Sequence, residues 1–412
     1  MKKTLLLLLI VSLSFAKPKT VKTGADVLLE SRFDLIKGKR VGLVTNHTAV
    51  LSNGKHLADA LHERGDVELK ILFGPEHGVR GDTPDGGQIN DSVDEKTGIP
   101  VVSLYGKINK PTPEMLKDID VLLFDIQDVG TRFYTYISTM FLCMEAAAEN
   151  KVHFVVLDRP NPITGMRVEG PMRVDSLKTF VGWVPIPIAH GMTVGELAVM
   201  ANLEGWLNNK VTAKLTVVKM ENWKRSMWYD QTKLKWIKPS PNIRAVQSAV
   251  VYPGTCLIEG INVSEGRGTE KPFEYISAPW IDGKALSKNL NARKLPGVKF
   301  EPITVIPEEI PGVTSNPKYK GVECGGIFVN VKDRNRYQSV RTGVAIVHAI
   351  HELYPDSLRF RERGFDRLAG TPVVREMILA GKSVADIEST WKEELKEFVM
   401  KRNKALLYLE KR

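Results

Sequence analysis

Cysteine is scarce in this chain, and its scarcity argues against one common architecture. Only three cysteines, Cys143, Cys256 and Cys324, occur among the 412 residues. An odd and sparse set of this kind is not typical of a small domain held together by a framework of disulfide bonds. Cys143 lies in a helical pattern and is predicted to be a core residue. Cys256 and Cys324 could form one disulfide, a question that the sequence leaves open.

Several well-known catalytic motifs are also absent. The chain has no Gly-x-x-x-x-Gly-Lys-Ser/Thr phosphate loop, and no Gly-x-Gly-x-x-Gly follows the first predicted strand. It has no Gly-x-Ser-x-Gly nucleophile elbow and no His-Glu-x-x-His metal helix. We therefore expect no cofactor. Without an activated serine or cysteine, carboxyl groups become the main catalytic candidates, and glycoside hydrolysis is the typical chemistry that needs only positioned carboxyl groups.

Long hydrophobic stretches are missing as well, apart from one at the N-terminus. Residues 1–16 begin with Lys2 and Lys3, continue through an apolar stretch and end in the small-x-small sequence Ser14-Phe15-Ala16, which is the pattern of a signal peptide. The apolar stretch is shorter than the roughly 20 residues of a membrane-spanning helix, and no cysteine follows it for lipid attachment. We expect an exported protein, periplasmic or secreted, without a stable membrane anchor after cleavage.

The basic charge is spread along the chain and is not concentrated in one tract. The formal net charge is +10, of which Lys2 and Lys3 supply two. Nucleic-acid-binding proteins usually carry a dense basic patch with interleaved aromatic residues, so we expect no nucleic-acid partner. In an exported protein, this charge suits an anionic surround such as the bacterial cell wall. Solubility alone would explain the charge equally well.

Apolar stretches alternate with helical patterns from residue 40 to about residue 220. Continuous apolar strands separated by helices are typical of a parallel sheet that is covered on both faces. We predict strands at residues 41–44, 101–104, 121–126, 152–157 and 215–220, and one further strand that ends at residue 73. Helices are predicted at residues 55–64, 112–117, 134–150 and 192–207. Thr193 and Glu196 have capping-box spacing at the start of the last helix. Residues 17–244 are therefore predicted to form an α/β domain.

The chain changes character after residue 220. A cluster of Trp and Tyr at residues 223–236 is followed by Pro-Ser-Pro-Asn at residues 239–242, which breaks regular structure. We place the domain boundary after residue 244 and predict a smaller α+β domain over residues 245–412. Its predicted elements are a helix around 253–259, a glycine-rich loop at 264–269, strands at 298–306 and 326–331, and helices at 340–353, 373–380 and 384–407.

Four loops that follow predicted strands carry chemically capable side chains. In a parallel sheet, the carboxyl ends of the strands meet at one edge, where ligands bind. Each loop alone is explained equally well as an ordinary turn, but the four together predict a shared site. The residues are Asn46 and His47 in the first loop, Glu76, His77 and Arg80 in the second, Asp125, Asp128, Arg132 and Tyr134 in the third, and Arg159 and Asn161 in the fourth.

The glycine-rich loop of the second domain adds Glu265 and Arg267. If this loop folds over the strand ends, the site lies in a cleft between two domains, a common position for ligand sites. An ordinary surface turn is the alternative. The aromatic cluster at residues 223–236 could stack on a sugar ring or could simply pack between the domains.

These segments resemble the exo-β-N-acetylmuramidase family of peptidoglycan recycling. The resemblance rests on residues 73–81, 124–134, 157–162, 265–269 and 324–326, and extends from about residue 40 to 405. It implies a Rossmann-like N-terminal domain, a smaller C-terminal domain and an active site in the cleft between them. It also implies release of N-acetylmuramic acid from the non-reducing end of cell-wall fragments. The favoured catalytic residue of the family lies in a Pro-Glu-His-Gly segment, which matches Glu76 here.

A mechanism follows as a hypothesis. Glu76 is expected to be the general acid, because partial burial under the second domain would help its carboxyl to keep a proton. The second catalytic group is Glu265, Asp128 or the acetamido oxygen of the substrate, held by Asp125 or Asp128. Retention or inversion depends on the carboxyl separation, which the sequence does not give.

Muramic acid carries a lactyl carboxylate, which an arginine fork can bind in bidentate geometry. At least one arginine among Arg132, Arg159 and Arg267 is expected to do so. The side chains of Asn46, Asn161 and Asn242 could bind sugar hydroxyls. The other expected substrate contacts are His47, His77, Arg80, Asp125 and Tyr134.

Two other classes of protein stay open. One is a metal-dependent hydrolase, for instance a deacetylase, that uses His47, His77, Asp125 and Asp128, although no ligand spacing supports a metal site. The other is a muropeptide-binding protein without catalysis. The sequence does not indicate the oligomeric state.

Overall fold

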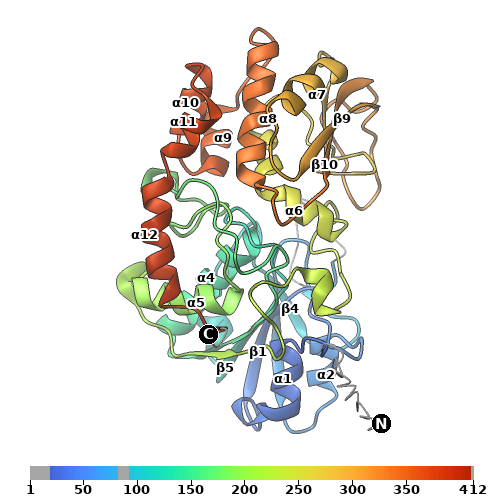
Figure 1. The fold of residues 1–412 in the computed structure, drawn as a ribbon. Helices are drawn as coiled ribbons and strands as arrows, with labels where there is room; N and C mark the ends of the chain where they lie inside the picture. The colour runs from blue at the N-terminus through green and yellow to red at the C-terminus, as the bar shows by residue number, and fades with distance from the viewer. Residues whose placement is uncertain (1–18, 82–91, 410–412) are drawn as a thin grey trace, which may run out of the picture.

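The computed structural model describes residues 19–81 and 92–409, so the predicted signal peptide lies outside the described residues. The chain forms two lobes, one above the other (Figure 1). The first lobe contains a seven-stranded sheet with the order β3-β4-β2-β1-β5-β6-β7. All neighbouring strands are parallel except β3, which pairs antiparallel with β4. The strands are β1 (Arg40–Thr45), β2 (Glu68–Gly74), β3 (Ser92–Val93), β4 (Pro100–Ser103), β5 (Val121–Asp125), β6 (His153–Leu157) and β7 (Leu215–Val218).

The sheet has the topology that the family resemblance implied. Starting at β1, the chain adds β2 and β4 on one side of the sheet, then returns to add β5, β6 and β7 on the other side. This reversal creates a topological switch point between β1 and β5, where ligands usually bind in Rossmann-like folds. The prediction of an α/β fold with a parallel sheet is therefore confirmed.

Both faces of the sheet are buried, which explains the continuous apolar strands. Alternate residues of one strand enter two different cores, as the two-residue period of a strand requires. In β5, Leu123 joins the core with α1 (Gly24–Ser31) and α2 (Leu57–His62). Leu122 and Phe124 join the core with α4 (Thr135–Glu149) and α5 (Val194–Glu204). The predicted capping box of α5 is also present, because Thr193 and Glu196 each accept a backbone hydrogen bond from the other.

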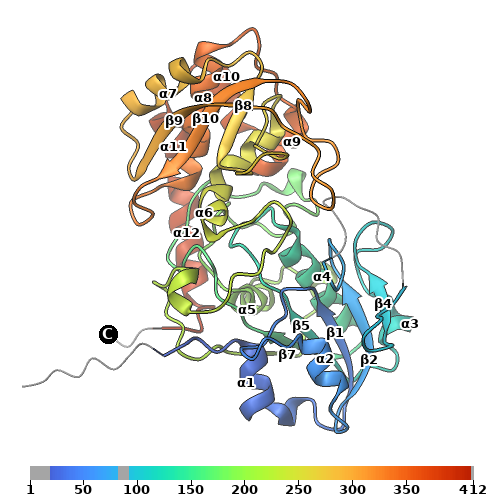
Figure 2. The ribbon, with the colours of Figure 1, turned by 90° about the vertical axis from the view of Figure 1, so that its right-hand side faces the viewer.

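The second lobe is built on a three-stranded antiparallel sheet in the order β8-β10-β9. Figure 2 shows this sheet and its helices above the first lobe, with α6 at the junction. The strands are β8 (Tyr275–Ala278), β9 (Val298–Val305) and β10 (Cys324–Val331), and the helices are α6 (Val246–Thr255), α7 (Gly283–Ala292), α8 (Ser339–Leu353), α9 (Glu362–Ala369), α10 (Val373–Leu379), α11 (Val384–Ser389) and α12 (Lys392–Asn403). The α+β prediction for this lobe is confirmed, although β8, α7 and α9 were not predicted.

One predicted helix is wrong in its extent. The segment 384–407 forms two helices, α11 and α12, instead of one. The chain leaves helical geometry at Trp391, whose side chain is buried. Burial of this large side chain therefore accompanies the break that the helical pattern did not predict.

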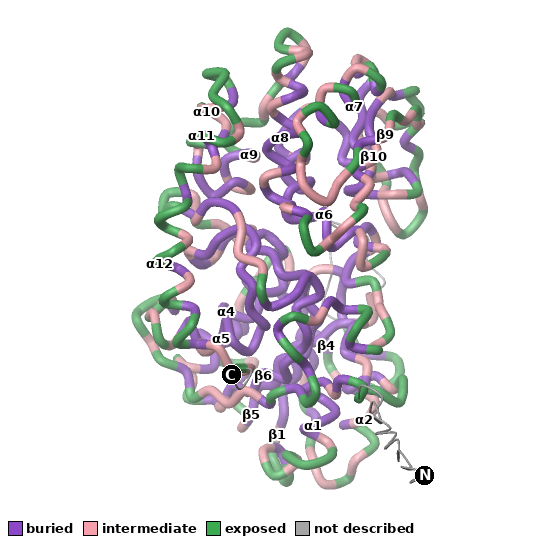
Figure 3. Tube along the Cα trace, viewed as in Figure 1, coloured by how far each residue is buried: buried purple, intermediate pink, exposed green. Residues whose placement is uncertain are grey.

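The C-terminal helix ties the two lobes together. Figure 1 shows α12 running down from the second lobe beside α5 of the first. The Arg402 guanidinium donates hydrogen bonds to the carbonyl oxygens of Gly165 and Gly191. The Tyr408 hydroxyl donates to the Asp158 carboxylate at 2.6 Å. Buried residues also continue through the junction of the lobes in Figure 3. The second lobe is thus attached at both of its ends.

The three cysteines are buried and free. The Cys256 and Cys324 pair that the sequence left open does not form. The Cys256 thiol lies 3.6 Å from a Glu259 oxygen, whereas the Cys324 thiol donates to the Val322 carbonyl. Among the described residues, no helix combines the length and apolar character that crossing a membrane requires.

Candidate active site

The ends of β2, β4 and β5 meet the second lobe around one cavity. The cavity has a volume of about 170 Å³. Its lining includes residues that follow three strands of the first lobe, Glu76, His77, Tyr105, Tyr134, Thr135 and Tyr136. The second lobe contributes Tyr252, Glu259, Arg267 and Phe273. The expected position of the site, between the two lobes at the carboxyl edge of the sheet, thus corresponds to a cavity that contains two carboxyl groups.

Glu76 is held in place by two hydroxyl groups. The Thr135 hydroxyl, at the first residue of α4, donates to a Glu76 carboxylate oxygen at 2.9 Å. The Tyr105 hydroxyl is also hydrogen-bonded to Glu76, and burial together with the charge of Glu76 raises the pKa of Tyr105. Hydroxyl donors favour the ionised form of a carboxyl group. The two hydroxyl groups therefore orient the Glu76 carboxyl group at the cavity.

The loop that carries Glu76 has an unusual backbone conformation. His77 has a φ of 72°, in the left-handed region that residues other than glycine rarely adopt, and its side chain is buried. Such a conformation costs about 1–2 kcal/mol for an L-residue. The neighbouring Gly81 has a φ of 80°, and a Cβ atom there would lie 2.6 Å from the His47 ring. The loop therefore closes tightly against the β1–α2 loop, which fixes the direction of Glu76.

The second lobe supplies a cluster of two carboxyl groups and two cations. The Arg267 guanidinium lies 2.8 Å from a Glu259 oxygen and 3.2 Å from a Glu265 oxygen. The Lys318 ammonium lies 3.0 Å from the other Glu265 oxygen and also donates to the carbonyl oxygens of Ile261 and Val263. Glu265 is thus enclosed behind Arg267, whereas Glu259 lines the cavity. Glu259 was not among the predicted site residues.

The surroundings of this cluster shift the pKa values of Glu259 and Arg267. Burial and the negative charges of Glu265 and Glu76 raise the pKa of the Glu259 carboxyl well above its ordinary value. Burial also lowers the pKa of Arg267 to about 10, so the guanidinium stays charged near neutral pH. The cavity therefore contains an arginine cation beside a carboxyl group that tends to keep its proton.

An aromatic wall closes the cavity between the two carboxyl groups. The Tyr134 ring makes edge-to-face contacts with Tyr136, at 4.9 Å between centroids, and with Tyr252, at 6.0 Å. The Tyr252 ring continues the wall to Phe273 at 4.7 Å. Residues of both lobes interlock here, which gives the cavity a rigid side.

Three predicted substrate-binding arginines are instead structural. The Arg159 guanidinium is buried and binds both oxygens of Asp125, at 2.5 and 3.0 Å. Arg132 is completely buried and donates to the carbonyl oxygens of Pro171, Ile186 and Leu368. Arg80 binds the carboxylates of Asp59 and Asp94. These three guanidinium groups bind other parts of the fold, and of the predicted arginines only Arg267 lines the cavity.

The polar residues that follow β1 and β6 also serve the fold. Asn46 accepts two hydrogen bonds from Thr48 and is bonded to the Tyr136 hydroxyl behind the aromatic wall. The His47 ring contacts the Lys238 carbonyl oxygen at 2.7 Å. Asn161 donates to the Met192 carbonyl oxygen. None of these lines the cavity with Glu76, nor does Asn242, which is buried.

Asp128 lies behind the cavity. One of its oxygens accepts a hydrogen bond from the Gly130 backbone at 2.6 Å, and burial raises the pKa of its carboxyl to about 7. The His190 ring is 3.9 Å away, and its pKa is lowered by burial to about 3. Asp128 does not line the cavity, so the structure does not place it to hold an acetamido group.

The fold does not gather the residues that a metal-dependent hydrolase was expected to use, His47, His77, Asp125 and Asp128, into a metal site. Both oxygens of Asp125 are occupied by Arg159, and His47 is bonded to a backbone carbonyl. Over residues 19–81 and 92–409, no group of three or more potential His, Cys, Asp or Glu ligands is arranged around a common point.

The aromatic cluster at residues 223–236, for which sugar stacking and packing were both open, packs between structural elements. Trp223 makes an edge-to-face contact with Tyr408, and Trp236 with Tyr229, at 4.9 and 4.8 Å between ring centroids. The Trp228 indole donates to Asn335 of the second lobe. The packing alternative is therefore the one that the structure supports.

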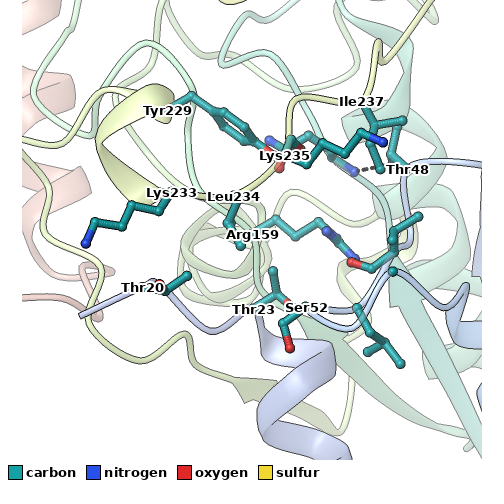
Figure 4. A pocket seen from close by; sticks show the side chains of 14 residues that line it. Thr20, Thr23, Thr48, Ser52, Arg159, Tyr229, Lys233, Leu234, Lys235 and Ile237 are labelled. Atoms are coloured by element: carbon teal, nitrogen blue, oxygen red, sulfur yellow. Dashed lines mark hydrogen bonds between the residues drawn. The ribbon is translucent and has the colours of Figure 1, made fainter. Parts of the chain in front are cut away.

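A second cavity, of about 240 Å³, lies at the ends of β1 and β6. Figure 4 shows Arg159, Tyr229, Thr48 and Lys235 around it. No carboxyl group belongs to its lining residues, and its one guanidinium is paired with Asp125. This second cavity therefore offers no pair of carboxyl groups like Glu76 and Glu259.

Tyr105 and Glu259 line the cavity but were not among the predicted site residues, and the sequence contained only weak signals for them. Tyr105 comes directly after the strand that we predicted at residues 101–104, so the rule that selected Glu76 also applies to it. Glu259 is a lone carboxyl group in an apolar segment, and such a residue is unusual where the segment becomes largely buried. Neither signal indicates that the two residues meet.

Comparisons with known proteins agree with this architecture. Family models described as the N-terminal and C-terminal parts of exo-β-N-acetylmuramidase NamZ match residues 41–247 and 250–408. The chain is 49% identical over 394 residues to the peptidoglycan β-N-acetylmuramidase NamZ of Bacillus subtilis, covering 95% of this chain and 92% of that protein.

Two solved structures have the same fold. Both are DUF1343 family proteins from Bacteroides fragilis. BF0371 has a TM-score of 0.88 and 41% identity, covering 95% of this chain and 99% of its own. BF0379 has a TM-score of 0.77 and 34% identity, covering 95% and 100%. With two family models that span most of its length and a relative of this identity, the chain belongs to the exo-β-N-acetylmuramidase family.

Proposed function

We propose that this protein is a glycosidase that releases N-acetylmuramic acid from the non-reducing end of peptidoglycan fragments. The observation that carries this proposal is the cavity between the lobes, in which Glu76 and Glu259 come from different lobes. Glycoside hydrolysis typically uses such a pair of carboxyl groups and no cofactor. The Bacillus subtilis relative, named a peptidoglycan β-N-acetylmuramidase, supports the choice of sugar.

Arg267 is the proposed ligand of the lactyl carboxylate. It is the only one of the three predicted arginines that lines the cavity. A hydrogen bond to a charged group contributes about 1.5–3 kcal/mol. Loss of this contact should therefore lower kcat/KM for a muramide by about 10- to 150-fold. A glucosaminide has no lactyl group, so selectivity between the two sugars should fall in an Arg267→Gln variant.

The proposed place of action is outside the cytoplasm. This proposal rests on the pattern of residues 1–16 and on the basic charge, which suits an anionic polymer. Mass spectrometry of the protein from a native host tests it. A mature N-terminus at about residue 17 is expected, whereas an intact N-terminus in a cytoplasmic fraction would contradict it.

The test of function is turnover of an aryl N-acetyl-β-muramide by the purified mature chain, beside the matching glucosaminide. Turnover of the muramide is expected, and it should persist with a chelator. Glu76→Gln should nearly abolish it while the fold stays intact. Glu68→Gln is the matched control, because Glu68 is exposed on β2, the strand that precedes the loop of Glu76. Analysis of glycan digests should show released monosaccharide first, as an exo-acting enzyme requires.

Three results would contradict the proposal. Binding of muropeptides without turnover would indicate a binding protein. Loss of turnover on chelation would favour a metal-dependent hydrolase. Near-normal turnover by Glu76→Gln would remove Glu76 from the mechanism.

A further inference from the structure

We propose that Glu259 is the proton donor to the leaving sugar, with Glu76 as the ionised partner. This inference rests on the proposed function, because it names the second catalytic group of that same cavity. It also reverses the role that the sequence alone led us to give Glu76.

The position of Glu259 is fixed by its surroundings. It lies in the short 3-10 helix η5 (Cys256–Gly260), which follows α6 and faces the cavity. Gly260, the next residue, is pressed against the backbone of α9, because a Cβ atom there would lie 2.5 Å from the Phe365 Cα. The Arg267 guanidinium holds one Glu259 oxygen at 2.8 Å. The other Glu259 oxygen lies 3.6 Å from the Cys256 thiol, a weak donor that a ligand oxygen can replace.

The balance of charge decides which carboxyl group keeps a proton. The cluster contains three carboxyl groups, from Glu76, Glu259 and Glu265, but only two cations, Arg267 and Lys318. Glu265 contacts both cations, one with each oxygen. Glu76 accepts from two hydroxyl groups, and its charge also acts on Arg267. Glu259 contacts one cation, Arg267, which it shares with Glu265, and the charge of Lys318 acts on it from farther away. Glu265 contacts both cations directly, so Glu259 is the less compensated of these two carboxyl groups.

Burial adds to this difference. A buried carboxyl group beside other negative charges favours its neutral form. Glu259 is partly buried, with 29% of its side chain exposed, and the charges of Glu265 and Glu76 both oppose its ionisation. A bound lactyl carboxylate would add one more negative charge to the cavity. Binding of a muramyl substrate should therefore hold the proton on Glu259 more firmly than binding of a glucosaminide.

The two roles account for the atoms of the reaction. The Glu259 proton moves to the glycosidic oxygen while the bond between that oxygen and C1 breaks, and the bonding electrons stay on the leaving oxygen. Ionised Glu76 stabilises the positive charge that develops at C1. A water oxygen then bonds to C1, and a proton of that water returns to the Glu259 carboxylate. One water is consumed and both carboxyl groups are restored.

The leaving group tests this assignment directly. A dinitrophenolate leaves without protonation, whereas the sugar alcohol of a natural disaccharide needs a proton. General acid catalysis is worth about 10²- to 10⁴-fold in rate. Glu259→Gln should therefore lose about 10²- to 10⁴-fold in kcat on a muramyl disaccharide, but less than about tenfold on a dinitrophenyl muramide. Glutamine keeps an oxygen for the Arg267 contact, so the geometry of the cluster should persist.

Two variants serve as controls. Glu76→Gln should lower kcat on both substrates to a similar extent, because the charge of Glu76 is needed whichever group leaves. Glu270→Gln changes an exposed carboxyl group near the same loop and should behave as wild type. The alkaline limb of the pH profile for the dinitrophenyl substrate should also disappear in Glu259→Gln, which a merely structural role would not cause.

Equal losses on both substrates, or no loss on the disaccharide, would overturn the assignment of Glu259. An alkaline limb that persists in the variant would overturn it as well. These outcomes differ from failure of the proposed function, in which the wild-type protein itself turns over no muramide.

Discussion

Replacing Arg159 with methionine removes the cation from an enclosed ion pair. The Asp125 side chain at the end of β5 is 0% exposed, and Arg159 holds its two oxygens at 2.5 and 3.0 Å. Removing one partner of a buried pair leaves an uncompensated charge, which costs about 3–5 kcal/mol. Methionine fills much of the volume of the arginine stem, so the lost charge should dominate. The free energy of unfolding should therefore fall by about 3–5 kcal/mol.

Thermal unfolding measures this loss. An unfolding entropy of about 2.1 cal/mol/K per residue gives about 0.9 kcal/mol/K for 412 residues. The melting temperature should therefore fall by about 3–6 °C. Turnover by the folded variant, measured well below its transition, should stay close to wild type because Arg159 does not line the cavity with Glu76.

A double variant provides the control. Asp125→Leu combined with Arg159→Met replaces the whole pair by apolar groups, and such replacements are often neutral or stabilising. It should recover most of the lost stability. An unchanged melting temperature in the single variant would refute the buried-pair argument. Loss of turnover without loss of stability would indicate that Arg159 binds the substrate after all.

Three further predictions concern stability and thiols. Burial raises the pKa of Asp128 to about 7, so the folded state keeps a proton that the unfolded state releases, and stability should fall between about pH 4 and 7. Asp128→Asn should flatten that fall, on the order of 4 kcal/mol, in thermal unfolding at pH 4 and 8; an identical slope would contradict it. Gly254→Ala should destabilise by about 1–3 kcal/mol because its Cβ would lie 1.9 Å from the Ser339 carbonyl oxygen, whereas Gly364→Ala, at 3.5 Å, should not. Alkylation under denaturing, non-reducing conditions should label all three cysteines, and any unlabelled pair would reveal a disulfide.

The alternatives that the sequence left open now differ in support. A metal-dependent hydrolase based on Asp125 would first have to release that residue from Arg159. A binding protein needs no second carboxyl group, yet Glu259 is held beside Arg267 at the cavity. The charge and hydroxyl environment of the two carboxyl groups is explained more directly by catalysis than by binding alone.

The sequence determined the layered fold and the approximate place of the site. Continuous apolar strands at residues 41–44 and 121–126 predicted a parallel sheet because such strands are stable only when both faces are covered. Thr193 and Glu196 predicted the start of α5 because capping depends only on residues close in the chain. The strand-end rule selected Glu76 for the same local reason. All of these features depend on short-range patterns.

Only the tertiary structure decided which polar groups act together. Arg132, Arg159 and Arg267 look alike as sequence, since each follows or lies in a polar loop. Folding encloses the first among carbonyl oxygens, pairs the second with Asp125 and leaves the third at the cavity. Glu259 likewise becomes a candidate only when the second lobe brings it opposite Glu76. Whether a buried charge is compensated depends on neighbours distant in the chain, and no local pattern contains that information.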